Sequence, residues 1–206
     1  MTTKIFIILD RSGSMSSCWD DTIGGFNTFV EKQKNMKDDK AYISLYQFDH
    51  EYEVNYENRD IAKVEDLTKE TFIPRGRTAL LDAIGKTINN IPKKPENESY
   101  IVVIMTDGEE NASINYSKTH INDLISNKKE LGWEFIFIGA NQDAIKEAAT
   151  LGISVDSALN YDTKKTGAVF ESLSAAIGRT RSTPMVNRMA NKVHFTPKER
   201  NDSIAN

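Results

Sequence analysis

Apolar segments alternate along the chain with segments in which apolar residues recur every three or four positions. The segments 4–9, 100–105 and 133–138 are dominated by apolar residues, as in strands that are buried on both faces of a parallel sheet. Helical spacing is found between and after them, over residues 20–36, 80–91, 116–131, 143–151 and 163–177. This order of strands and amphipathic helices predicts an α/β fold with a mostly parallel sheet.

A different pattern surrounds Asp49-His50, which is a candidate two-residue turn. The segment before it, Ala41–Phe48, is predicted as a strand. Residues 51–57 alternate between the two faces of a strand, and the side chains expected to share one face are Tyr52, Val54 and Tyr56. The pattern predicts a hairpin that ends in a half-exposed antiparallel edge strand, with acidic residues on its outer face.

Together these segments predict a Rossmann-like, doubly wound three-layer sandwich, with a mostly parallel central sheet and one antiparallel edge strand. In such sheets, ligands bind beyond the carboxyl ends of the strands, near the point where the winding reverses. Loops begin near Asp10, Asp107 and Gly139 at this edge, and Thr78 precedes a helix there. Any chemistry is therefore expected in these loops.

The C-terminal part of the sequence divides near Gly178. A last strand is predicted at Ile153–Leu159, and a helix at Thr163–Ile177 is closed by Gly178 as its C-cap. Residues 1–178 are therefore expected to form one domain. Residues 179–206 lack a period and carry a net charge of +4, against -8 for the rest of the chain. They are expected to form an extended or flexible basic tail.

Composition excludes several classes of protein. The net charge of -4 argues against a dedicated nucleic-acid binder, and the apolar runs are far shorter than a membrane span. The N-terminus lacks the cleavage pattern of a signal peptide. Cys18 is the only cysteine, so no internal disulfide forms, which favours a reducing compartment. We expect a cytoplasmic protein that is monomeric on its own.

Five oxygen-bearing side chains are candidates for a metal site. Ser12 and Ser14 follow Asp10 at alternate positions, and alternate residues of an extended loop point the same way. Thr78 adds a third hydroxyl and Asp107 a second carboxylate. Oxygen ligands of this kind suit hard cations such as Mg²⁺, with Mn²⁺ and Ca²⁺ as alternatives.

The charge of this set indicates what such a metal would do. Two carboxylates balance a divalent ion, and neutral hydroxyls are weak donors, so the ion stays electrophilic. Mg²⁺ takes six ligands and usually keeps waters, so one position is expected to be exchangeable. A Glu or Asp side chain of a partner protein is suited to that position.

Each candidate also has a simpler interpretation. Asp10 and Asp107 are also compatible with plain strand ends, and Ser12 and Ser14 with a turn. Thr78 stands where an N-cap is expected, so capping, metal ligation or both are open. A nearby pair, Glu109 and Glu110, is expected to be solvated loop acids or helix-start residues, with added negative charge at the site as the alternative.

Three phrases of the sequence resemble those of von Willebrand factor type A domains: "ILDRSGSM", "GRTALLDAIG" and "IVVIMTDGEEN". The resemblance covers residues 1–178 and is greatest to small stand-alone versions from bacteria and phages. It identifies the five residues as a metal-ion-dependent adhesion site. It implies that Ser12, Ser14 and Thr78 ligate the ion, and that Asp10 and Asp107 act directly or through water. Members of the family typically bind proteins through the metal and are not catalytic.

The sequence therefore favours a metal-dependent protein-binding module that is not an enzyme. One alternative is a structural or assembly protein in which the metal only braces the loops. A Mg²⁺-dependent phosphohydrolase is a further alternative, but haloacid-dehalogenase-like enzymes need a second Asp where this chain has Ser12. The sequence also lacks a P-loop and a nucleophile elbow.

Overall fold

A six-stranded sheet forms the centre of the molecule. The computed structural model describes residues 2–36, 39–140, 143–184, 187 and 192–204. The strands lie in the order β3-β2-β1-β4-β5-β6, and every neighbouring pair is parallel except β2 and β3. Their bounds are β1 Thr2–Asp10, β2 Lys40–Phe48, β3 Tyr52–Asp60, β4 Glu98–Thr106, β5 Trp133–Ala140 and β6 Ala158–Tyr161. The predicted fold class is confirmed.

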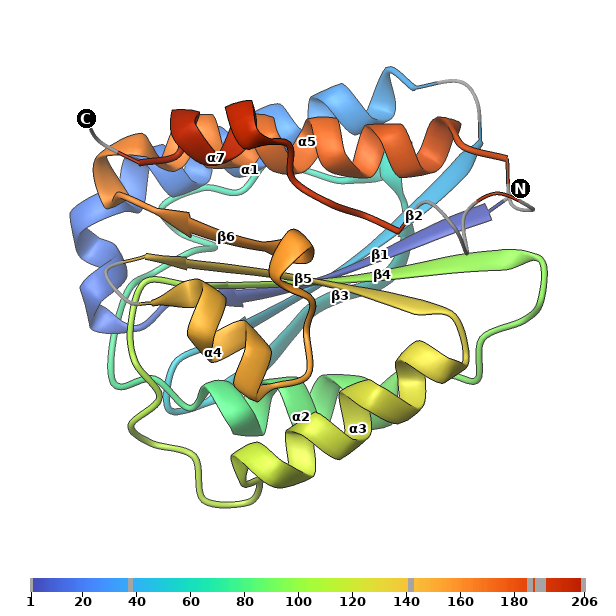
Figure 1. The fold of residues 1–206 in the computed structure, drawn as a ribbon. Coiled ribbons are helices and arrows are strands. Elements are labelled where there is room, and N and C mark those ends of the chain that lie inside the picture. Colours follow the sequence, from blue (N-terminus) through green and yellow to red (C-terminus); the bar gives the residue numbers. More distant parts are fainter. Residues whose placement is uncertain (1, 37–38, 141–142, 185–186, 188–191, 205–206) are drawn as a thin grey trace.

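Helices cover both faces of the sheet (Figure 1). Helices α1 and α5 lie on one face, and α7 lies beside α5; helices α2 and α3 lie on the opposite face. The helix bounds are α1 Trp19–Lys34, α2 Leu80–Asn90, α3 Lys118–Glu130, α4 Ala144–Thr150, α5 Thr166–Ser182 and α7 Pro197–Asp202. None of the described helices is both long and apolar enough to cross a membrane.

Strand β1 shows why its sequence is apolar at successive positions. Ile5 and Ile7 pack into the core under α1 and α5, whereas Phe6 and Ile8 pack into the core over α2 and α3. Both faces are buried, so an alternation of apolar and polar residues is not required. From β1 the chain winds to β2 on one side and later returns to β4 on the other side. The winding therefore reverses between β1 and β4, at the strand ends that carry Asp10 and Asp107.

The edge strand β3 differs from the prediction. The register between β2 and β3 shifts near Leu45, which marks a β-bulge. Tyr52 consequently packs against the α2 side of the sheet and Tyr56 against the α1 side, while Val54 is 45% exposed. The prediction that these three side chains share one face was wrong, because an extra residue in a strand reverses the alternation beyond it.

The predicted extended tail is also wrong for the described residues beyond 178. Helix α5 continues through Gly178 to Ser182, because Arg181 is buried and pairs with Asp39 at 2.8 Å. Further on, residues 197–202 form α7, which begins with a capping box between Thr196 and Glu199. A domain limit at residue 178 stays a prediction.

The segment before α7 packs against the other sheet edge. Val193 and Phe195 are buried in the core, and Arg200 donates to the carbonyl of Ala158 at 2.7 Å. Strand β6 itself begins only at Ala158, because residues 155–157 form a 3₁₀ turn. The predicted strand from Ile153 is therefore shorter than expected.

Candidate metal centre

The structure brings the five predicted oxygen-bearing residues together at the carboxyl edge of β1 and β4. The position of Gly108 shows how closely three of the side chains approach one another. A Cβ atom at this glycine would lie 3.2 Å from Thr78 Oγ1, 3.3 Å from Ser14 Oγ and 3.9 Å from Ser12 Oγ. The three hydroxyls therefore surround one small space, which the absence of a side chain at Gly108 keeps open.

Hydrogen bonds connect the hydroxyls to the two carboxylates. Ser14 Oγ donates to Asp107 Oδ1 at 2.6 Å, and the hydroxyl oxygens of Ser12 and Ser14 are 3.1 Å apart. Asp10 accepts from the backbone N–H of Ser12 at 2.6 Å and from Thr106 Oγ1 at 2.5 Å. These bonds connect four of the five residues, and Thr78 places its hydroxyl beside them at Gly108.

Both carboxylates of this arrangement are buried. Asp10 is fully buried and Asp107 is 4% exposed. Within the described part of the chain, neither forms an ion pair with a lysine or arginine. Burial raises the pKa of Asp10 to about 7 and also raises the pKa of Asp107. A bound cation would supply the missing positive charge.

The donor set fits a hard divalent cation. No cluster of three or more His, Cys, Asp or Glu side chains that could hold a metal is found among the described residues. The ligands available here are two carboxylates and three hydroxyls, which are all oxygen donors. Oxygen donors suit Mg²⁺, Mn²⁺ and Ca²⁺ rather than ions that prefer nitrogen and sulfur.

Thr78 is held by its backbone, and its side chain does not cap α2. Its N–H donates to Asn111 Oδ1 at 3.0 Å, and its carbonyl accepts from the N–H of Asn111 at 3.0 Å and of Ala112 at 3.1 Å. The residue at the N-cap of α2 is Ala79, which forms no side-chain cap. The interpretation of Thr78 as a cap was wrong, and its hydroxyl faces the space beside Gly108.

Two acids, Glu110 and Asp82, fix the loop after β4, and neither role was predicted from the sequence. Glu110, expected to be solvated, accepts from the N–H groups of Leu81 and Ser113 at 2.9 and 2.7 Å. Asp82 in α2 accepts from the N–H groups of Asn115 and Tyr116 at 2.9 and 3.0 Å. The expectation for Glu110 was wrong, whereas Glu109 is exposed.

Thr106 and Gly108 belong to the centre but were not predicted. Thr106 donates to Asp10, and Gly108 leaves space for the three hydroxyls. In the sequence, only their position on either side of Asp107 hints at these roles. A threonine or glycine in a loop has many simpler explanations, so adjacency alone does not identify them.

Comparison with known proteins gives the family and the fold. The family model of the von Willebrand factor type A domain matches residues 4–176. No protein with a curated description matches the sequence.

Similar solved structures include proximal thread matrix protein 1 from the mussel byssus, with a zinc-occupied MIDAS motif. It is 16% identical with a TM-score of 0.65, over 86% of this chain and 46% of that one. This chain thus spans about half the length of the mussel protein. The vWF domain of the type V pili tip protein Mfa5 from Porphyromonas gingivalis is 12% identical, with a TM-score of 0.67, over 89% of this chain and 97% of that one.

A third similar structure is the ArnB paralog VWA2 from Sulfolobus acidocaldarius. It is 16% identical, with a TM-score of 0.57, over 84% of this chain and 44% of that one. At these identities, the likeness supports a shared fold and does not extend to ligands or partners.

Proposed function

The chain belongs to the von Willebrand factor type A domain family, and from this premise we propose that it is a divalent-metal-dependent protein-binding module. In this proposal Asp10, Ser12, Ser14, Thr78 and Asp107 hold Mg²⁺. The observation that carries the proposal is the space beside Gly108, where three hydroxyls meet next to two buried carboxylates that form no ion pair among the described residues.

The donor chemistry explains why the module would bind an acidic partner. Two carboxylates neutralise a divalent ion, and the three hydroxyls are neutral, so the bound ion keeps much of its affinity for a further anionic oxygen. Mg²⁺ also tends to retain exchangeable waters. A Glu or Asp side chain of a partner protein would replace one such water, and the metal would supply the attraction for that carboxylate.

The residues around the site support binding rather than catalysis. Asp10, which would be the nucleophile of a phosphohydrolase, is fully buried and accepts two hydrogen bonds. Ser12 stands where a general acid would be needed, and a serine hydroxyl is a poor proton donor at neutral pH. A cytoplasmic location and a monomeric state stay predictions from the sequence.

The proposal is tested by carboxylate capture at the bound metal. Mn²⁺ replaces Mg²⁺ as a paramagnetic probe, and the relaxation of water protons reports the waters on the ion. We expect the α-amide of N-acetylglutamate to lower this relaxation at millimolar concentrations, because its side-chain carboxylate displaces a water. The α-amide of N-acetylglutamine, the matched neutral control, should have little effect. Failure of Mn²⁺ to bind, or an equal response to both compounds, would contradict the proposal.

A further inference from the structure

A buried carboxylate lies beside the metal centre and contacts both of the first two metal-binding loops. Asp49 follows β2 and is fully buried. Its Oδ2 accepts from Arg11 Nε at 3.0 Å and from Arg75 Nε at 2.9 Å, while its Oδ1 accepts from the N–H of Glu51 at 2.7 Å. We call Asp49, Arg11 and Arg75 the Asp49 cluster.

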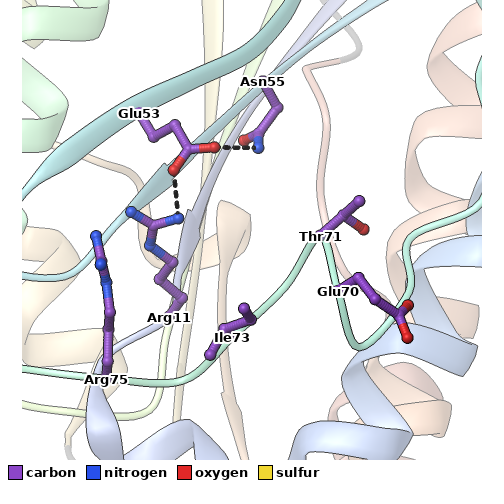
Figure 2. A pocket seen from close by; sticks show the side chains of 7 residues that line it. All are labelled: Arg11, Glu53, Asn55, Glu70, Thr71, Ile73 and Arg75. Atoms are coloured by element: carbon purple, nitrogen blue, oxygen red, sulfur yellow. Dashed lines mark hydrogen bonds and ion pairs between the residues drawn. The ribbon is translucent and has the colours of Figure 1, made fainter.

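Each arginine of the cluster belongs to a different metal-binding loop. Arg11 lies between Asp10 and Ser12, and Arg75 lies three residues before Thr78. In Figure 2 the two side chains extend side by side from neighbouring segments. One carboxylate oxygen therefore connects the loop of Ser12 with the loop of Thr78.

Backbone hydrogen bonds place the same two loops in direct contact. The N–H of Arg75 donates to the carbonyl of Arg11 at 2.8 Å, and that of Gly13 donates to the carbonyl of Gly76 at 3.2 Å. The N–H of Ala79, which follows Thr78, donates to the carbonyl of Asp49 at 2.8 Å. A shift of either loop would break several of these bonds at once.

The outer acids of the region cannot take over the role of Asp49. Glu53 accepts from Arg11 Nη1 at 2.6 Å, and Glu51 accepts from Arg75 Nη2, but their side chains are 50% and 61% exposed. Glu53 also lines an open cavity of about 340 Å³ between Arg11 and Thr71 (Figure 2). Water screens these outer pairs, whereas the Asp49 carboxylate is shielded from it.

We propose that Asp49 is a positioning residue that sets the spacing between the hydroxyls of Ser12 and Ser14 and that of Thr78. Two guanidinium groups donate to one oxygen, so they are neighbours and repel each other without its charge. An uncharged residue at this position would let the two loops separate, and the hydroxyls would no longer converge beside Gly108. The inference rests on the proposed metal binding.

The test is a double-mutant cycle on Mn²⁺ affinity, measured by calorimetry. We expect Asp49→Asn to weaken Mn²⁺ binding at least tenfold, as removal of groups that orient ligands commonly does. Arg75→Gln, at a half-exposed residue, should have a smaller effect. The double variant should bind more tightly than Asp49→Asn alone, because it removes one of the two repelling charges.

Asp39→Asn is the matched control, because Asp39 is a buried acid paired with Arg181. It should lower stability without changing Mn²⁺ affinity.

If Asp49→Asn does not fold, Arg75→Lys replaces it. Loss of the fork-shaped guanidinium donor should weaken Mn²⁺ binding while the charge at this position stays the same. Unchanged Mn²⁺ affinity in Asp49→Asn, or purely additive effects in the cycle, would overturn the inference. Absence of Mn²⁺ binding in the wild type would instead refute the proposed function.

Discussion

Two pairs of buried aspartates at the same edge of the sheet have opposite surroundings. Asp10 and Asp107 receive few hydrogen bonds and no ion pair among the described residues, and burial raises the pKa of both. Burial also favours a raised pKa for Asp49 and Asp82, but hydrogen bonds outweigh it, and the pKa of both is lowered. Donors rather than depth therefore decide whether a buried acid is stable as an anion.

The comparison separates acids that organise the fold from acids that we propose to bind a metal ion. Asp82 fixes the loop after β4 with four hydrogen bonds, and Asp49 joins two loops through two arginines. These anions are stabilised by the chain itself. A bound cation would stabilise the carboxylates of Asp10 and Asp107 in the same way.

The largest expected effect on stability is that of Asp82→Ala. Four donors would lose their acceptor, from the backbone of Ile114, Asn115 and Tyr116 and the side chain of Asn115. We expect the free energy of unfolding to fall by about 3–4 kcal/mol, because hydrogen bonds to a charged acceptor contribute about 1.5–3 kcal/mol each. The losses are not fully additive, and water can reach these part-buried donors. Urea denaturation measures this value. A loss below about 1 kcal/mol would show that Asp82 does not organise the loop.

Asp10→Asn is expected to raise the free energy of unfolding of the metal-free protein, by somewhat less than Asp82→Ala lowers it. The pKa of Asp10 is about 7 when folded and about 3.9 when unfolded. The folded state therefore holds the proton more tightly, and stability is lost progressively as the pH rises from about 4 to about 7. Asparagine has no such proton, so the variant should be more stable by about 2–3 kcal/mol at pH 8.

The pH dependence supplies the control for this prediction. Below pH 4, Asp10 is protonated in both states, so the advantage of Asp10→Asn should vanish. Asp39→Asn, which breaks a buried ion pair, should instead lower stability at pH 8. Urea denaturation in a chelator at both pH values measures these effects. Equal stability of wild type and Asp10→Asn at pH 8 would contradict the claim that Asp10, unlike Asp49 and Asp82, is destabilised as a buried anion.

The smallest expected effect is that of Gly108→Ala. Its Cβ would crowd the hydroxyls of Thr78 and Ser14 at 3.2 and 3.3 Å, and these would shift by a few tenths of an ångström. We expect Mn²⁺ affinity to fall about tenfold, as for other small disturbances of ligand orientation. Gly24→Ala is the control, because a Cβ there meets no atom of the described residues within 4 Å. Calorimetry with both variants decides whether the space beside Gly108 matters.

Local patterns in the sequence predict the fold well, and they also pick out the five residues that the structure brings together. Buried strands appear as apolar runs, and a polar residue directly after such a run, such as Asp10 or Asp107, lies at the carboxyl edge of the sheet. The topology then brings these residues together. The helix at 197–202 was also predictable, because Thr196 and Glu199 have the spacing of a capping box.

The remaining features depend on contacts between distant parts of the chain. Arg11 and Asp49 are 38 positions apart, and Asn115 lies 33 positions from Asp82. No local pattern records which acid meets which donor, so Asp49, Asp82 and Glu110 could not be assigned from the sequence. The bulge near Leu45 could not be predicted for the same reason, because its extra residue is defined only by the pairing of two strands.

Calorimetric titration with Mg²⁺ is the most direct test of metal binding by Asp10, Ser12, Ser14, Thr78 and Asp107. We expect one Mg²⁺ to bind per chain at millimolar or lower concentration. Asp10→Asn should abolish binding while remaining folded, and Asp39→Asn should leave binding intact. Absence of Mg²⁺ binding in the wild type, or undiminished binding in Asp10→Asn, would contradict a metal site at these residues.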